Sequence, residues 1–268
     1  MKMKNNSTIE VVLLGGKGTI GSGLRKFLPK INPNYRFTIV DNEQSIDKSD
    51  VVNSNEVFIN LDISNEEEKL SEVLLNKDLI IYLARKDPLN EMNKMTDLVF
   101  KTVEKFNPNA LIIGSSSVHA TGGAYFPFLK EPYKTIASRE FNKLETWPEL
   151  LNANIEPCPT GDYGLEKAYV ESWCQRFAVT NMNAIAARWG GINIDNKMID
   201  EVAYFTVWCH QEDSAKFVDS CYMTFINGKL RSGAHYYVIS RNKYSIFDIE
   251  TPKKEIGYNP THDAEIFY

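Results

Sequence analysis

Tyr163 and Lys167 form a pair that could carry acid–base chemistry, because a phenol and an ammonium lie four positions apart. In a helix this spacing places both side chains on the same face. A free tyrosine, with a pKa of about 10, is a poor base at neutral pH. A nearby cation favours the phenolate and moves its pKa toward the working range. The pair could therefore take a proton from a substrate hydroxyl.

A run of serines gives this pair its context, since a Tyr-x-x-x-Lys spacing arises easily by chance in a chain with 13 tyrosines. The apolar residues 110–113 lead through Gly114 into three consecutive serines, the last of them Ser117, and predict a strand that ends in hydroxyl groups. In open α/β sheets, ligands bind outside the carboxyl ends of the strands. Ser117 could then hydrogen-bond the reacting oxygen of a substrate, or it could merely cap a turn.

The elements that must position these residues begin with a glycine-rich turn near the N-terminus. Residues 11–14 are a continuous apolar run, typical of a buried parallel strand, and they lead into Gly16-x-Gly18-x-x-Gly21 and a helical pattern. Glycines let the backbone turn tightly and approach a pyrophosphate, whose charge the N–H groups of a helix N-terminus stabilise. We predict that this turn binds a dinucleotide; a strand-turn-helix unit without a ligand is the alternative.

Two acids follow at the ends of the next predicted strands. Residues 37–40 run into Asp41, and 41 − 21 = 20 residues is the offset expected for the acid that binds the adenosine ribose. Residues 57–61 run into Asp62, which we place beside the adenine. Because a 2′-phosphate would meet the carboxylate of Asp41, we predict NAD rather than NADP as the cofactor.

Strand and helix patterns alternate along the chain and predict a Rossmann fold, a doubly wound parallel α/β sheet with helices on both faces. We expect a helix capped by Ser64, with Glu67 three residues on, and a helix over 136–151 that Pro148 breaks. The remaining predicted strands are 78–84, 184–188 and 235–240, and the remaining predicted helices are 89–106, 163–177 and 214–225.

No linker divides the sequence, so we expect a single domain over residues 1–268 with a small substrate-binding portion within 189–268. The segment 123–162 is an insertion between Ser117 and Tyr163, which are 163 − 117 = 46 positions apart. Its aromatic content is too apolar for a freely solvated loop. We predict that it lies over the active site as a lid, or packs on a second subunit.

Composition argues against several classes of function. With 43% hydrophobic and 24% charged residues, the chain is typical of a soluble globular protein. A net charge of −5 without a dense basic segment argues against a nucleic-acid partner. The apolar run behind the N-terminal lysines is too short for a signal peptide, so we expect a cytoplasmic protein with no membrane partner. Four separated cysteines and four scattered histidines indicate neither a disulfide framework nor a metal site.

Taken in order, these motifs resemble the extended short-chain dehydrogenase/reductases, the NAD-dependent epimerase/dehydratase family. The resemblance implies NAD as cofactor and catalysis by Ser117, Tyr163 and Lys167, with Asn93 supporting the lysine through water. We also expect a homodimer. The resemblance places the cofactor against these residues: Gly15, Gly18, Thr19, Ile20, Gly21, Asp41, Asp62, Leu83, Ala84, Tyr163 and Lys167.

Within that family the chain is most similar to uronate dehydrogenases, on the runs Ser116-Ser117-Val118-His119 and Arg188-Trp189-Gly190. The likeness implies that Arg188 binds a substrate carboxylate and that His119 binds a sugar hydroxyl. In the alternative reading His119 is structural and Arg188 pairs with a carboxylate such as Glu166. We therefore predict an NAD-dependent oxidoreductase acting on a small, acidic sugar. A sugar epimerase or dehydratase is the first alternative, and a non-catalytic dinucleotide-binding sensor or scaffold is the second.

Overall fold

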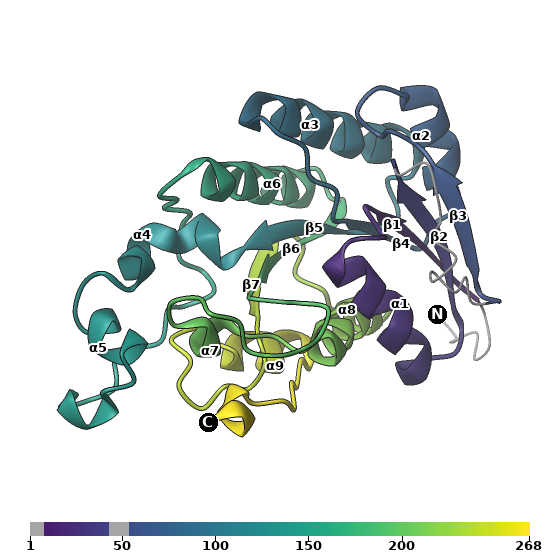
Figure 1. Ribbon diagram of the computed structural model, residues 1–268. Coiled ribbons are helices and arrows are strands. Elements are labelled where there is room, and N and C mark those ends of the chain that lie inside the picture. The colour runs from purple at the N-terminus through teal and green to yellow at the C-terminus, as the bar shows by residue number, and fades with distance from the viewer. Residues whose placement is uncertain (1–7, 43–53) are drawn as a thin grey trace.

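The protein, seen in a computed structural model, is described over residues 8–42 and 54–268, and the described strands form a seven-stranded sheet (Figure 1). The strands are β1 (Ile9–Leu14), β2 (Tyr35–Asp41), β3 (Glu56–Asn60), β4 (Leu79–Tyr82), β5 (Leu111–Ser117), β6 (Asn183–Trp189) and β7 (Ala234–Val238). Their spatial order is β3-β2-β1-β4-β5-β6-β7, and every neighbouring pair is parallel. This order confirms the predicted doubly wound sheet.

Helices cover both faces of the sheet. The longer ones are α1 (Thr19–Ile31), α2 (Glu67–Leu74), α3 (Leu89–Phe106), α6 (Asp162–Val179) and α8 (Gln211–Ile226); the shorter ones are α4 (Gly122–Tyr125), α5 (Tyr133–Ala137), α7 (Tyr204–Val207) and α9 (Glu250–Ile256). Figure 1 shows α2, α3 and α6 on one face and α1 and α8 on the other. The parallel strands are therefore shielded from water on both sides, as their continuous apolar sequences require.

Alternation along β1 builds two separate cores. Val11 and Leu13 point into one core with α1 and α8, while Val12 and Leu14 point into the other with α2, α3 and α6. All four side chains are completely buried. Because successive residues of a strand face opposite sides, this one strand fixes the register of both helical layers.

Two local predictions were wrong. Ser64 does not cap α2, because its N–H and hydroxyl both donate to the carboxylate of Asp62, at 3.0 and 2.6 Å. No helix covers 136–151, since α5 ends at Ala137 and Arg139 takes a left-handed φ of 56°. Beyond that point only a short 3-10 turn, Phe141–Lys143, follows.

The insertion 123–162 leaves the sheet after β5 and returns at α6, beside the carboxyl end of the sheet (Figure 1). Its aromatic residues pack on the C-terminal portion of the same chain. Phe141 stacks on Tyr244 with ring centroids 3.7 Å apart, and the indole of Trp147 donates to the Ser245 carbonyl at 3.2 Å. The backbone of Leu151 hydrogen-bonds to the 246–248 stretch. The insertion is therefore seated within this chain, and its role as a lid stays a prediction.

Candidate active site

The glycine turn forms the first part of the site, between β1 and α1. Gly15 has a left-handed φ of +86°, and a Cβ there would lie 2.6 Å from the amide nitrogen of Ala84. A Cβ on Gly21 would lie 2.4 Å from the Gly16 carbonyl oxygen. Only glycine fits these two positions, so the turn passes close to the end of β4 and α1 starts directly behind it. The first N–H groups of α1, including those of Thr19 and Ile20, are therefore available to a phosphate.

The two predicted acids meet in a hollow of about 370 Å³ on the β2 side of this turn. The Asp41 carboxylate accepts the backbone N–H groups of Lys17 and Asn42, each at 3.0 Å, which holds it beside the turn. The hydrogen bond from the Ser64 hydroxyl is the main reason that the pKa of Asp62 lies below its usual range. The structure thus brings together six of the residues predicted to bind the cofactor: Gly15, Gly18, Asp41, Asp62, Leu83 and Ala84.

Two further hollows continue along the carboxyl edge of the sheet. The middle hollow is lined by the glycine turn, by Thr19 and Ile20, and by Tyr163. The last is lined by Ser117, His119 and Tyr163, so the tyrosine borders both. Because the first and middle hollows also share Gly15, a single path leads from the adenosine end to the catalytic candidates. A dinucleotide would extend along such a path.

The predicted catalytic residues come from two neighbouring elements. Ser117 ends β5, while Tyr163 and Lys167 lie one turn apart at the start of α6. The Lys167 ammonium lies 5.3 Å from the centroid of the Tyr163 ring, and its side chain is buried. The geometry predicted from the four-residue spacing is therefore present, with the serine at the same hollow.

The electrostatics of Tyr163 differ from the simple expectation. Burial raises the pKa of Tyr163, a hydrogen bond with Ser117 lowers it, and the negative charge of Glu166 raises it further. Lys167 pairs with Glu166 at 3.4 Å, while burial lowers the pKa of its ammonium. The lysine charge is thus balanced by a carboxylate, which weakens its influence on the phenol.

Glu166 and Arg85 complete the surroundings of Tyr163, although no sequence motif gives either of them a role at the phenol. The Arg85 Nε donates to Glu166 at 2.8 Å, and its other nitrogens bond to Asp87. The Arg85 guanidinium lies 5.4 Å from the centroid of the Tyr163 ring, where its charge lowers the phenol pKa. Glu166 is buried although it lies next to a catalytic candidate in the sequence. A buried carboxylate needs a partner, and this requirement is the only signal that could have linked the two.

Asn93 and His119 lie where supporting roles are possible. The Oδ1 of Asn93 is buried and has no hydrogen-bond partner in the described part of the chain. Such an atom calls for a bound water, which is the role predicted for this residue. The His119 ring lies against Tyr163 with centroids 5.5 Å apart, and burial lowers its pKa, so the imidazole is neutral at neutral pH.

Arg188 lies elsewhere, and its predicted contact with a substrate carboxylate is not supported by its position. The side chain is completely buried, and two of its nitrogens each donate to Glu171 at 2.8 Å. The remaining donors reach the carbonyls of Ala153 and Ile155, at 3.0 and 2.8 Å. The partner is Glu171 rather than Glu166, one helical turn further along α6. Arg188 therefore joins β6, α6 and the end of the insertion.

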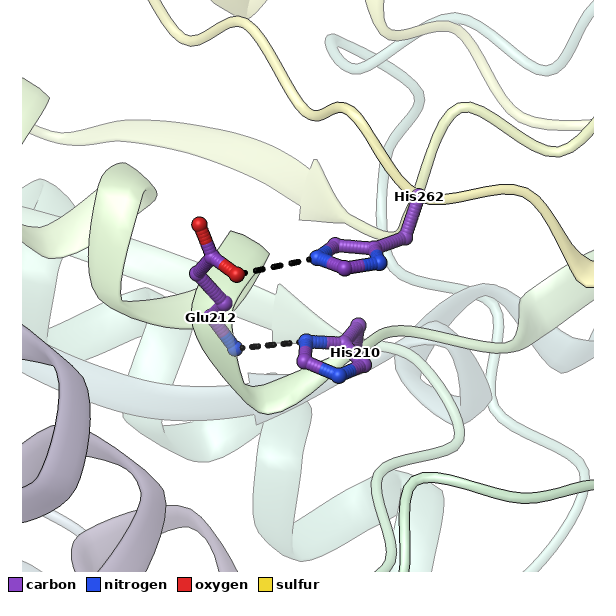
Figure 2. A group of neighbouring side chains, drawn as sticks. All are labelled: His210, Glu212 and His262. Carbon is purple, nitrogen blue, oxygen red and sulfur yellow. Dashed lines mark hydrogen bonds and ion pairs between the residues drawn. The ribbon is translucent and has the colours of Figure 1, made fainter.

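His210, Glu212 and His262 form a cluster away from these hollows, although the histidines seemed scattered in the sequence (Figure 2). The His210 Nδ1 accepts the Glu212 N–H at 3.0 Å, and the His262 Nε2 lies 3.1 Å from the Glu212 carboxylate. The two imidazoles stack at 3.7 Å with an interplanar angle of 15°. One ion cannot lie in two nearly parallel ring planes, so this geometry favours a packing contact over metal coordination.

No protein-family model matches the sequence, and neither does any curated protein. Solved structures do match the fold. A glucuronic acid dehydrogenase from Chromohalobacter salexigens superposes with a TM-score of 0.74 at 16% identity, covering 96% of this chain and 86% of its own. A mutated uronate dehydrogenase gives a TM-score of 0.73 at 16% identity, covering 96% and 83%. The dTDP-glucose 4,6-dehydratase of Bacillus anthracis, solved with NAD, gives a TM-score of 0.70 at 16% identity, covering 97% and 94%.

The fold shared with these structures is a Rossmann-type α/β fold, with the glycine turn between β1 and α1. At 16% identity the likeness establishes the fold and no more. Among the described residues, no helix has both the length and the apolar character needed to cross a bilayer.

Proposed function

We propose that the chain is an NAD-dependent oxidoreductase of the extended short-chain dehydrogenase/reductase family, which oxidises an alcohol or lactol on a small sugar-like substrate. The observation that carries the proposal is the position of Tyr163. Its ring borders both the hollow below the glycine turn and the hollow that holds Ser117. A substrate carbon and a nicotinamide could therefore meet beside one phenol. The dehydrogenases and the dehydratase of the same fold support this reading.

The residues divide the work by position. Tyr163 takes the proton of the substrate hydroxyl, while Ser117 hydrogen-bonds the same oxygen and holds it in place. Lys167, once it is drawn from Glu166 toward the cofactor ribose, adds positive charge beside the phenolate. NAD, when bound, supplies the hydride acceptor. Asp41 would accept the ribose hydroxyls, so we expect NAD to bind more tightly than NADP.

The rival functions use the same cofactor site in other ways. An epimerase or dehydratase would return the hydride to the sugar and commonly needs another acid or base near the serine. Val118, which follows Ser117, is apolar and buried and supplies none, so in the described lining of that hollow this role would fall to His119 or Glu201. A silent dinucleotide sensor has no use for Ser117 and Tyr163 at one hollow with Lys167 beside the tyrosine ring. We propose the cytoplasm and a homodimer as the setting, on the sequence alone.

The experiment is to incubate purified protein with NAD and a panel of uronic acids, aldoses and nucleotide sugars, and to follow NADH absorbance. Tyr163→Phe is the matched variant, because it removes only the hydroxyl. We expect turnover to fall by about 100-fold or more while NAD affinity, measured by calorimetry, stays nearly unchanged. A Phe variant that keeps most of its kcat, or tighter binding of NADP than of NAD, would contradict the proposal.

A further inference from the structure

The hollow that holds Ser117 and Tyr163 has one ionised side chain on its described lining, the carboxylate of Glu201. His119 is neutral at neutral pH, because burial lowers its pKa. The other side chains of the lining are neutral polar or apolar groups: Ser117, Val118, Tyr163, Ile192, Asn193, Ile199, Tyr204 and Val207. A ligand in this hollow therefore faces a net negative charge.

Glu201 stands on the loop between β6 and α7, and its side chain is exposed. Within the described residues, no lysine or arginine nitrogen approaches its carboxylate within 4.0 Å. Its charge affects the pKa values of two other residues that line the hollow, His119 and Tyr204. It opposes the lowering of the His119 pKa that burial causes, and it adds to the raising of the Tyr204 pKa that burial causes. The carboxylate is thus both solvated and close to the space a substrate would fill.

The cations nearest the reacting end are already matched by carboxylates. Arg85 bonds to Glu166 at 2.8 Å and to Asp87 at 2.7 Å. Lys167 shares the same Glu166 at 3.4 Å. Two positive and two negative charges therefore balance beside Tyr163, and Glu201 adds a further negative charge across the hollow. The described residues that line this hollow include no lysine or arginine to receive a substrate carboxylate.

The hollow on the other side of Glu201 does not supply one either. It is lined by Lys134 and Arg139, but also by Asp200 together with Glu201. Arg139 pairs with Glu265 at 2.9 Å, so the remaining charges on the lining of this hollow are one ammonium, of Lys134, and two carboxylates, of Asp200 and Glu201. Arg188, the residue expected to meet a substrate acid, is fully buried against Glu171.

We infer that Glu201 is a specificity-determining residue, and that it selects a sugar which presents a hydrogen-bond donor, a hydroxyl or an ammonium, instead of a carboxylate. An ionised carboxylate can only accept hydrogen bonds. A hydroxyl or ammonium of the sugar can donate a hydrogen bond to it, whereas a second carboxylate meets a like charge and loses about 10- to 100-fold in affinity. This inference rests on the proposed function, and it replaces the acidic sugar predicted from the sequence with a neutral or amino sugar.

The test compares glucose with glucosamine, which carries an ammonium at C2, and with glucuronate, which carries a carboxylate at C6; each of the two differs from glucose in one substituent. The kcat/KM of each with NAD is measured for the wild type, for Glu201→Gln and for Asp200→Asn. Asp200→Asn is the control, because it removes the same charge from the adjacent position, which lines only the neighbouring hollow. Saturation-transfer NMR of the same sugars on the NADH complex reads the charge preference without turnover.

We expect the wild type to disfavour glucuronate relative to both other sugars by about 10- to 100-fold, mainly through KM. Glu201→Gln should remove most of that difference, and Asp200→Asn should leave it in place. The inference is overturned if glucuronate is the best substrate or ligand, or if Glu201→Gln does not alter the preference among the sugars. In either case, NADH formation that depends on Tyr163 would still uphold the proposed function. No NADH formation with any sugar of the wider panel refutes the function, and the NMR preference then still decides the role of Glu201. Failure of all three sugars to bind overturns the inference.

Discussion

Replacing Arg188 with methionine should lower the free energy of unfolding of the protein without changing its substrate preference. The guanidinium is completely buried and gives two hydrogen bonds to Glu171 and two to carbonyls of the insertion. Its loss leaves Glu171 as a buried charge whose remaining described donor is the Ser116 hydroxyl, at 2.5 Å. Breaking a buried pair in this way costs about 3–5 kcal/mol. The free energy of unfolding should fall by that amount.

Equilibrium urea unfolding, followed by tryptophan fluorescence, measures the loss. Arg176→Met is the matched control, because its pair with Glu104 is half exposed and should be worth about 0–1 kcal/mol. The double variant Arg188→Met/Glu171→Leu should recover part of the stability, since no charge is left buried. About 1–3 kcal/mol should remain lost, because Ser116 and the two insertion carbonyls still lack a partner.

The opposite pattern would refute this assignment. A loss below about 1 kcal/mol in Arg188→Met, combined with a KM that rises only for sugars carrying a carboxylate, would place Arg188 at the substrate. The coupling between Arg188 and Glu171 would then be small in the double variant. Stability and substrate choice are read in separate assays, so the two roles cannot be confused.

The remaining predictions concern the base, the histidine stack and the insertion. Glu166→Gln removes a negative charge that raises the pKa of Tyr163, so the rise of kcat/KM with pH should move to lower pH; an unmoved profile would contradict this coupling. Burial, and to a smaller extent the charge of the stacked His262, lowers the pKa of His210 to about 4. The imidazole of His210 therefore binds a proton more readily in the unfolded chain than in the folded one. The free energy of unfolding should therefore fall as pH drops from about 6.5 toward 4, by roughly 1–2 kcal/mol after allowance for partial exposure, and His210→Asn should remove that dependence in acid titrations followed by circular dichroism. Trypsin should cleave the 123–162 segment more slowly when NAD and substrate are bound if the segment is a lid, and cleavage that ignores ligand would leave it a structural role.

Much of the fold and the cofactor end could be predicted because their signals are local. The turn from Gly15 to Gly21 places its glycines where a Cβ would collide, and Asp41 ends a buried strand that pairs with β1. The Tyr163 and Lys167 spacing depends only on helix geometry. These features need no knowledge of distant contacts, and the structure places them as the sequence predicts.

The features that escaped prediction depend on residues far apart in the chain. From the sequence, Arg188 at a strand end could bind a substrate carboxylate. Only the packing of α6 shows that its guanidinium is already paired with Glu171. Glu201 belongs to no motif, and its importance comes from the hollow it borders. His210 and His262 are 262 − 210 = 52 positions apart and meet only because the C-terminal segment folds back on α8. Sequence patterns carry no information on such pairs.

The seating of the insertion has a consequence for the order in which the chain can fold during synthesis. Its partners, Arg188, Tyr244 and the 246–248 stretch, all leave the ribosome after it does. A nascent chain that ends between 162 and 204 must therefore carry Phe141 and Trp147 without Phe205 and Tyr244, the later residues whose rings cover them. Exposed apolar side chains of this kind invite association with other chains. The ribosome-bound intermediate, rather than the finished protein, is the species that should need a chaperone.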